Sequence, residues 1–230
     1  MENKKSQLKK NKTKLLLAAL AITFAISTAF ALGYIIANVK VPLLQSQLSS
    51  YEQSIQSLSV LSNIGTSNST LSCSFMEGGL SSLDQELQNL NSEITSADTN
   101  SLYSSYYSNL IKQLTYTRIN YWLLAQRIKT QCGYQIANVL MLYPQNGCSN
   151  CGTEGSELYY LEQKSNYTII ATVIDADINI SQVETIDRIY NVTTYPTLII
   201  NENNTYVGYE NTQQLQKTIC EYSPKLDICS

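Results

Sequence analysis

The chain has 230 residues, of which 43% are hydrophobic and only 14% charged, with a net charge of −3 and no histidine. The absence of histidine excludes a Ser-His-Asp triad, a Cys-His nucleophile pair and any imidazole-ligated metal site. Beyond residue 41 there are 8 basic residues against 17 acidic ones. This part therefore lacks the basic face that nucleic-acid binding requires, and we expect no nucleic-acid partner.

Residues 1–14 form a basic tail with six lysines, and residues 15–39 follow as 25 residues without a charge. About 20 apolar residues suffice to cross the hydrocarbon core of a bilayer as a helix. Residues 15–39 are therefore predicted to be a single transmembrane helix. The hydroxyls of Thr23, Ser27 and Thr28 are compatible with it because they can bond to carbonyls of the same helix. The lysines predict that the N-terminus is cytoplasmic.

The alternative for this segment is a cleaved secretory signal, with the A-F-A sequence from Ala29 to Ala31 as the cleavage site. The apolar part of a signal is normally about 7–15 residues long, whereas here it continues to Val39, which favours a retained anchor. Under both interpretations residues 41–230 lie outside the cytoplasm. Two features agree with this location: all six cysteines follow the apolar segment, as expected in an oxidising compartment, and N-x-S/T sequons begin at Asn68, Asn166, Asn179, Asn191 and Asn203.

Residues 41–132 show apolar positions spaced by three and four, a heptad-like pattern that predicts helices with one apolar stripe each. Such a pattern is shared by coiled coils, but an antiparallel hairpin of the last two helices, turning at 96–100, is the simpler interpretation. It places Cys73, just before one helix, and Cys132, just after the other, at the same end. We expect a disulfide between them; the alternative is that each is a buried thiol.

From residue 137 the pattern changes to short apolar or β-branched runs that alternate with helical ones. Strands are predicted at 137–144, 166–175, 194–201 and 205–209. Helices are predicted at 153–164, with Leu158 and Leu161 inward, and at 182–190 and 211–222. The order is strand, helix, strand, helix, strand, strand, helix, which indicates an α/β domain over 135–230.

Two motifs in this domain carry a resemblance to a known family. C-S-N-C, from Cys148 to Cys151, follows the first strand, and Y-P-T places Pro196 at the start of a strand 48 residues after Cys148. With this spacing, residues 137–222 resemble the thioredoxin superfamily. The resemblance implies a thioredoxin-like βαβαββα fold for this domain. It says nothing about the transmembrane helix and the helical hairpin or bundle that are predicted to precede the domain. It also implies that Pro196 is cis, facing the disulfide, and that Tyr195 lies beside the sulfurs, where its backbone can pair with a substrate.

The chemistry of the pair follows from its position before a helix, since a thiolate is stabilised at a helix N-terminus. We expect Cys148 to be the nucleophile and Cys151, one turn inside the helix, to resolve the mixed disulfide. The chain departs from the family at Gly147, where a tryptophan is usual, and at Leu142, where an acid is usual. A purely structural Cys148–Cys151 bond is the alternative. Two ligands are too few for a metal site.

The remaining cysteines, Cys220 and Cys229, close a short loop at the C-terminus, and we expect a structural disulfide between them. Taken together, the sequence predicts a single-pass membrane protein with an extracytoplasmic thiol–disulfide oxidoreductase domain and no cofactor. Its partners would be protein thiols and disulfides, the lipid bilayer, and a membrane or soluble redox partner. The alternative function is a non-catalytic surface protein that uses the thioredoxin-like scaffold for binding.

Overall fold

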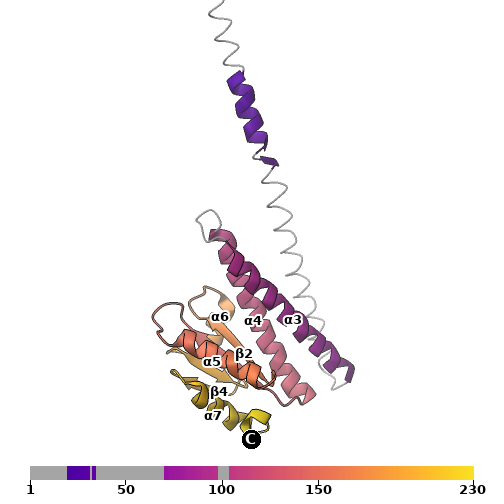
Figure 1. Cartoon of the computed structure of the whole chain (residues 1–230), viewed down its shortest axis with the longest axis vertical. Helices are drawn as coiled ribbons and strands as arrows, with labels where there is room; N and C mark the ends of the chain where they lie inside the picture. Colours follow the sequence, from indigo (N-terminus) through magenta and orange to yellow (C-terminus); the bar gives the residue numbers. More distant parts are fainter. Residues whose placement is uncertain (1–19, 32, 35–69, 98–103) are drawn as a thin grey trace, which may run out of the picture. The chain divides into compact units, whose positions relative to one another are not determined.

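The computed structural model describes residues 20–31, 33–34, 70–97 and 104–230 (Figure 1). Compact packing divides the chain into two units, residues 1–60 and 61–230. In the first unit, residues 20–31 are helical and exposed. The hydroxyls of Thr23, Ser27 and Thr28 donate to helix carbonyls three or four residues earlier. The predicted transmembrane segment, 15–39, lies partly outside the described residues, and no helix within them is long and apolar enough to span a membrane.

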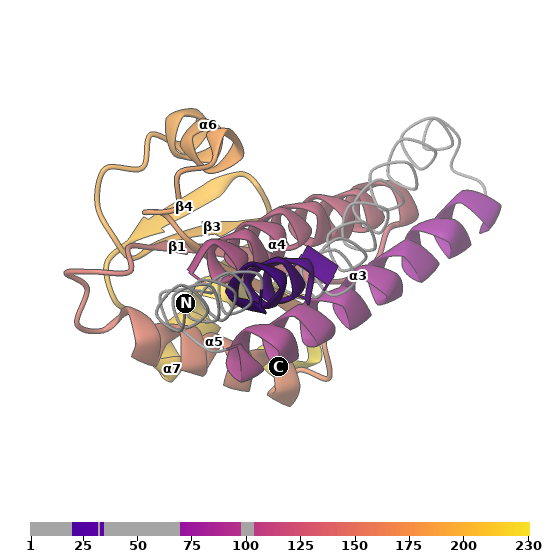
Figure 2. The same cartoon turned by 90° about the horizontal axis from the view of Figure 1, so that it is seen from above.

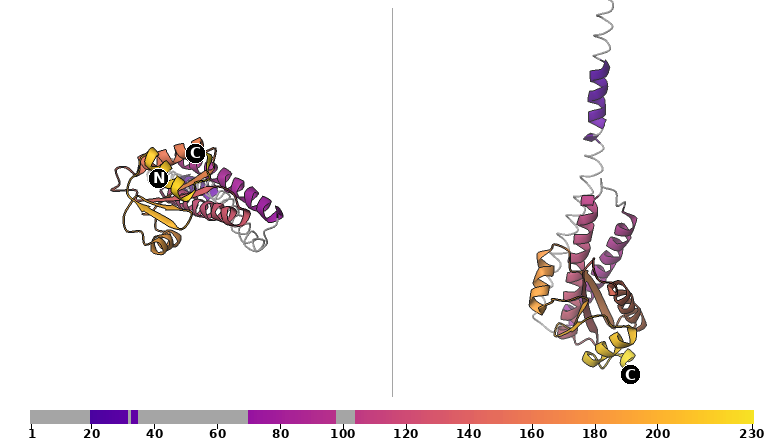
Figure 3. Two further views of the ribbon diagram at one scale, coloured as in Figure 1. Left: turned by 90° about the horizontal axis from the view of Figure 1, so that it is seen from below. Right: turned by 90° about the vertical axis from the view of Figure 1, so that its left-hand side faces the viewer.

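The second unit begins with two long helices, α3 (Thr70–Ser96) and α4 (Ser104–Cys132), which pack side by side (Figures 1 and 3). Leu90 of α3 is buried against Leu110 and Leu114 of α4. A hairpin of these two helices was predicted, and residues 98–103, at its turn, lie outside the described residues. The earlier apolar series of the predicted helical segment, at 41–58, lies outside them as well.

The start of α3 differs from the prediction. Cys73 was placed before this helix, but α3 begins at Thr70 and includes both Cys73 and the Gly78-Gly79 pair. Glycine inside a helix costs about 1 kcal/mol relative to alanine, and the apolar series on which the predicted helix rested begins only at Leu80. The burial of Met76 and the Cys73–Cys132 disulfide stabilise this first part of the helix.

A four-stranded sheet follows, formed by β1 (Ala137–Tyr143), β2 (Ile169–Asp175), β3 (Thr197–Ile200) and β4 (Asn204–Val207). The strand order is β2-β1-β3-β4, with β1 parallel to β2 and antiparallel to β3. Three helices alternate with these strands: α5 (Cys151–Lys164), α6 (Ser181–Tyr190) and α7 (Thr212–Tyr222). The topology is the predicted βαβαββα order of a thioredoxin-like fold.

Helices cover both faces of the sheet. Alternate residues of β1 point to opposite faces and so contact different helices. Val139 and Met141 pack with α5 and α7, whereas Leu140 and Leu142 pack with α6 and α4. Figure 2 shows α6 on one side of the sheet and α5 and α7 on the other. Trp122 of α4 is buried in the α6-side core. The sequence pattern did not reveal that α4 forms part of this domain.

A buried polar network also joins α4 to the sheet. The side chain of Asn138 in β1 donates to the carbonyl of Trp122 and to Gln126, both in α4. The backbone N–H of Asn138 donates to the side chain of Asn201, which in turn donates to Ser223, after α7. Because buried polar groups that lose their partners cost stability, this network fixes α4 and the end of α7 against the same end of the sheet.

Candidate functional site

The Cys148–Cys151 disulfide lies where the chain passes from β1 into α5. The two Cα atoms are 5.6 Å apart. Cys148 is half-buried, whereas Cys151 is 4% exposed and belongs to the core between the sheet and α5. A partly exposed first cysteine and a buried second one suit a pair in which a partner's sulfur reacts with the first.

The structure corrects the expected position of Cys151. The helix begins at Cys151, so this residue is its first one and not one turn inside. Gly147 has φ +83°, in the region that favours glycine, and the chain turns there before it enters α5. Cys148 therefore precedes the helix and faces its N-terminal end.

The N-terminus of α5 supplies hydrogen-bond donors close to Cys148. The first N–H groups of a helix have no partner within it, and the side chain of the N-cap residue, Asn150, makes no capping hydrogen bond. Those N–H groups and the helix dipole favour a negative charge at this end. After reduction, they would stabilise a thiolate at Cys148 and lower the pKa of its thiol.

The Tyr195–Pro196 peptide bond is cis and comes directly before β3. Thr197, the first residue of β3, pairs with Leu142 near the end of β1, so Pro196 and the loop that leads to Cys148 lie at the same end of the sheet. The carbonyl of Pro196 accepts a hydrogen bond of 2.8 Å from the N–H of Gly208. This bond connects the proline to the end of β4.

The side chain of Tyr195 makes its hydrogen bond to α6. Its hydroxyl donates to Asp187 at 3.5 Å. Burial, followed by the nearby Asp187 carboxylate, raises the pKa of Tyr195. Tyr195 also packs at the edge of the core that contains Trp122.

Glu154 was not identified from the sequence, although the structure places it in the core beside the redox pair. The buried residues of α5 are Cys151, Glu154, Leu158 and Leu161, a single helical stripe, and Glu154 is 0% exposed. One carboxylate oxygen accepts a hydrogen bond from the N–H of Glu210 at 3.3 Å. Burial raises the pKa of Glu154 to about 7, and the carboxylates of Glu210 and Glu157 add to the effect. The sequence did contain a signal for this residue, because a glutamate stands among the apolar positions of one helix face.

Glu154 predicts an unusual dependence of stability on pH. Its pKa is about 7 in the folded state against an ordinary 4.5, so the folded state holds the proton more tightly and its stability falls as pH rises between those values. Glu162, with a pKa also raised to about 7 by burial, acts in the same direction. Glu154→Gln should therefore reduce the slope and raise the free energy of unfolding near pH 8 by roughly 2 kcal/mol. Urea titrations at several pH values would test this; an unchanged slope would contradict it.

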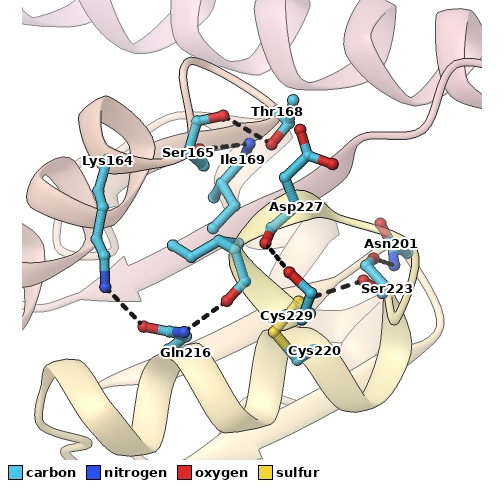
Figure 4. Close-up of a disulfide and its surroundings, with 12 residues drawn as sticks. Lys164, Ser165, Thr168, Ile169, Asn201, Gln216, Cys220, Ser223, Asp227 and Cys229 are labelled. Atoms are coloured by element: carbon cyan, nitrogen blue, oxygen red, sulfur yellow. Dashed lines mark hydrogen bonds between the residues drawn. A yellow bond between two sulfur atoms is a disulfide. The ribbon is translucent and has the colours of Figure 1, made fainter.

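The other two disulfides lie away from the pair. Cys73–Cys132, with Cα atoms 5.8 Å apart, joins the start of α3 to the end of α4. Cys220–Cys229 joins α7 to the short 3-10 helix η2 (Asp227–Cys229), as Figure 4 shows. Beside it, the side chain of Gln216 donates to the carbonyl of Ile228 and accepts from Lys164. All six cysteines are thus paired, and the described residues contain no cluster of metal-ligating side chains.

A groove of about 920 Å³ lies between α3 and the outer edge of β2, and its walls include none of the residues of the redox pair. Side chains form hydrogen bonds with the backbone N–H and C=O groups along that edge. Ser165 accepts from the N–H of Ile169, Glu162 accepts from the N–H of Ala171, and Arg118 donates to the carbonyl of Val173. Edge strands protected in this way resist pairing with other strands.

Comparison with known proteins gives few matches. No protein-family profile matches the chain, and no curated protein shows significant similarity to it. Among solved structures, one described as the structure of a malarial protein is 20% identical, with a TM-score of 0.32, over 38% of this chain and 97% of the other. The germline-specific thioredoxin Deadhead of Drosophila melanogaster is 19% identical, with a TM-score of 0.30, over 41% of this chain and 86% of its own.

Proposed function

We propose that the chain is a thiol–disulfide oxidoreductase that is tethered to a membrane by residues 15–39 and exchanges disulfides with exported or surface proteins. The observation that carries this proposal is the half-buried Cys148, bonded to a protected Cys151 at the N-terminus of α5. A structural disulfide gains nothing from a partly exposed cysteine at a helix N-terminus, whereas an exchange catalyst depends on it.

In the proposed reaction the Cys148 thiolate attacks a disulfide of the partner protein. A bond forms between Cys148 and one partner sulfur, and the other partner sulfur leaves as a thiolate. Cys151 then attacks Cys148, releases the partner as a dithiol and restores the Cys148–Cys151 disulfide. The reverse sequence oxidises a dithiol partner. The backbone at Tyr195 and Pro196, at the same end of the sheet, is the proposed contact for an extended partner segment.

The proposed location follows from the sequence. The basic tail would stay in the cytoplasm and residues 41–230 would face the oxidising side, where three disulfides are expected to persist. A redox partner in the membrane or in solution would then be needed to regenerate the pair after each turnover.

A second candidate function is binding without catalysis. The groove between α3 and the edge of β2 favours it, because this groove is concave and lies apart from the redox pair. In that case Cys148–Cys151 would serve only to hold the start of α5.

The reduction potential of the Cys148–Cys151 pair separates the two functions. The chain would be equilibrated in thiol buffers of known potential, and its labelled cysteines identified by mass spectrometry. For an exchange catalyst we expect a value between roughly −120 and −270 mV, and its place in that span indicates whether the protein acts as oxidant or reductant. A pair that stays oxidised below about −300 mV would be structural, and the binding function would replace the first proposal.

A further inference from the structure

The core around Cys151 raises the question of where the thiol proton goes. Cys151 must be a thiolate when it attacks Cys148, but its sulfur is buried, so water has little access to it. The position where the resembling family carries an acid is Leu142, which packs in the other core, on the α6 side of the sheet. A proton acceptor for Cys151 must therefore come from elsewhere.

Few titratable side chains adjoin the core that contains Cys151. Tyr143, Tyr206 and Tyr222 pack against it. Burial raises the pKa of Tyr143, and the hydrogen bond with Tyr222 raises the pKa of Tyr206 to about 12. Phenols of this kind cannot accept a proton from a thiol near neutral pH.

Glu154 has the position that the acceptor requires. It lies three residues after Cys151 on the same buried stripe of α5, a spacing that puts the two Cβ atoms about 5–6 Å apart. Helical side chains lean toward the helix N-terminus, which carries the carboxyl of Glu154 back toward Cys151. One oxygen of that carboxyl is bonded to the N–H of Glu210, and the other, Oε2, is buried without a partner among the described residues.

The charges that face Glu154 come from two elements and are all negative. Glu157, on the same helix, accepts from Tyr209, and Glu210, in the segment between β4 and α7, accepts from Thr218. Each of these two carboxylates also has one buried oxygen without a partner in the described part of the chain. These negative neighbours add to burial in favouring a proton on Glu154 near neutral pH, where an acid–base group works best.

We infer that Glu154 takes the thiol proton of Cys151 when Cys151 resolves the mixed disulfide, an inference that rests on the proposed function. The proton moves from Sγ of Cys151 to Oε2 of Glu154. The resulting thiolate attacks Sγ of Cys148, the bond between Cys148 and the partner sulfur breaks, and the partner leaves as a thiolate with the bonding electron pair. In the reverse direction Glu154 returns the proton to Cys151.

The test follows the two steps separately in the full chain, with only the Cys148–Cys151 pair reduced. Dithionitrobenzoate, a symmetrical aromatic disulfide, releases one coloured thionitrobenzoate when Cys148 attacks it and a second when Cys151 resolves the mixed disulfide. In the wild type, the rate of the second release should show an inflection near pH 7. In Glu154→Gln, which keeps the size and the acceptor oxygen, the second release should slow at least about tenfold near pH 7 and lose that inflection. The first release should be unchanged.

Glu157→Gln is the matched control, because it removes a carboxylate from the same cluster. It should keep the inflection, moved to lower pH since one negative neighbour of Glu154 is gone, and change the second release less than twofold. Equal rates and pH profiles for Glu154→Gln and the wild type would overturn the inference. So would a wild-type profile without the inflection, a result that needs no variant at all. A wild type that never gives a second release would instead overturn the proposed function.

Discussion

Replacing Cys148 with serine is expected to lower the rate of disulfide exchange by about a thousandfold or more, because a serine hydroxyl cannot replace the attacking thiolate. Replacing Cys151 instead should stop the reaction halfway. Cys148 would still attack the partner, but nothing would resolve the product, so mixed disulfides through Cys148 should accumulate. Non-reducing gels followed by mass spectrometry of the Cys151→Ser variant would detect them.

The control for both variants is the double replacement Cys220→Ser and Cys229→Ser, which removes the disulfide between α7 and η2. That variant should exchange disulfides at nearly the wild-type rate. If the Cys151→Ser variant instead runs as a monomer without mixed disulfides, Cys148 is unreactive. That result would favour the binding function over the catalytic one.

The second large effect concerns stability. Replacing both Cys73 and Cys132 with serine is expected to reduce the free energy of unfolding by about 4 kcal/mol. The bond joins residues 59 apart, and cross-linking such a loop lowers the entropy of the unfolded chain by that amount in the chain-entropy model. Urea denaturation, compared with the wild type, would measure the loss.

The same model predicts an order for the two structural disulfides. Cys220–Cys229 spans a separation of only 9, so its removal should cost about 3 kcal/mol, less than removal of Cys73–Cys132. A larger loss for the shorter loop would show that contacts in the folded state, and not loop entropy, determine the contribution of these bonds.

Much of the fold could be predicted from the sequence because its signals are local. The apolar run of β1, the β-branched run of β2 and the apolar stripes of α6 and α7 can each be recognised within one element. The helical hairpin followed from the spacing of leucines such as Leu83 and Leu90, both of which are buried. The start of α3 was missed because the apolar series begins only at Leu80, whereas the helix already includes the buried Met76 and the disulfide-bonded Cys73.

The features that could not be predicted depend on which elements pack against each other in the folded chain. Trp122 packs against the sheet while Leu110 packs against α3, and no periodicity in α4 indicates which partner each side meets. Glu154 was overlooked because only Leu158 and Leu161 were taken as the inward positions of α5. The pairing of its carboxyl with the N–H of Glu210 joins residues 56 apart and follows from the fold alone.

The double role of α4 has a consequence for anyone who wishes to graft this domain onto another protein. A segment cut at the first strand, near residue 135, would leave Leu140 and Leu142 without the helix that covers them, and Asn138 without its acceptors in that helix. The transplantable piece therefore starts at Thr70. It carries both arms of the hairpin as well as the strands.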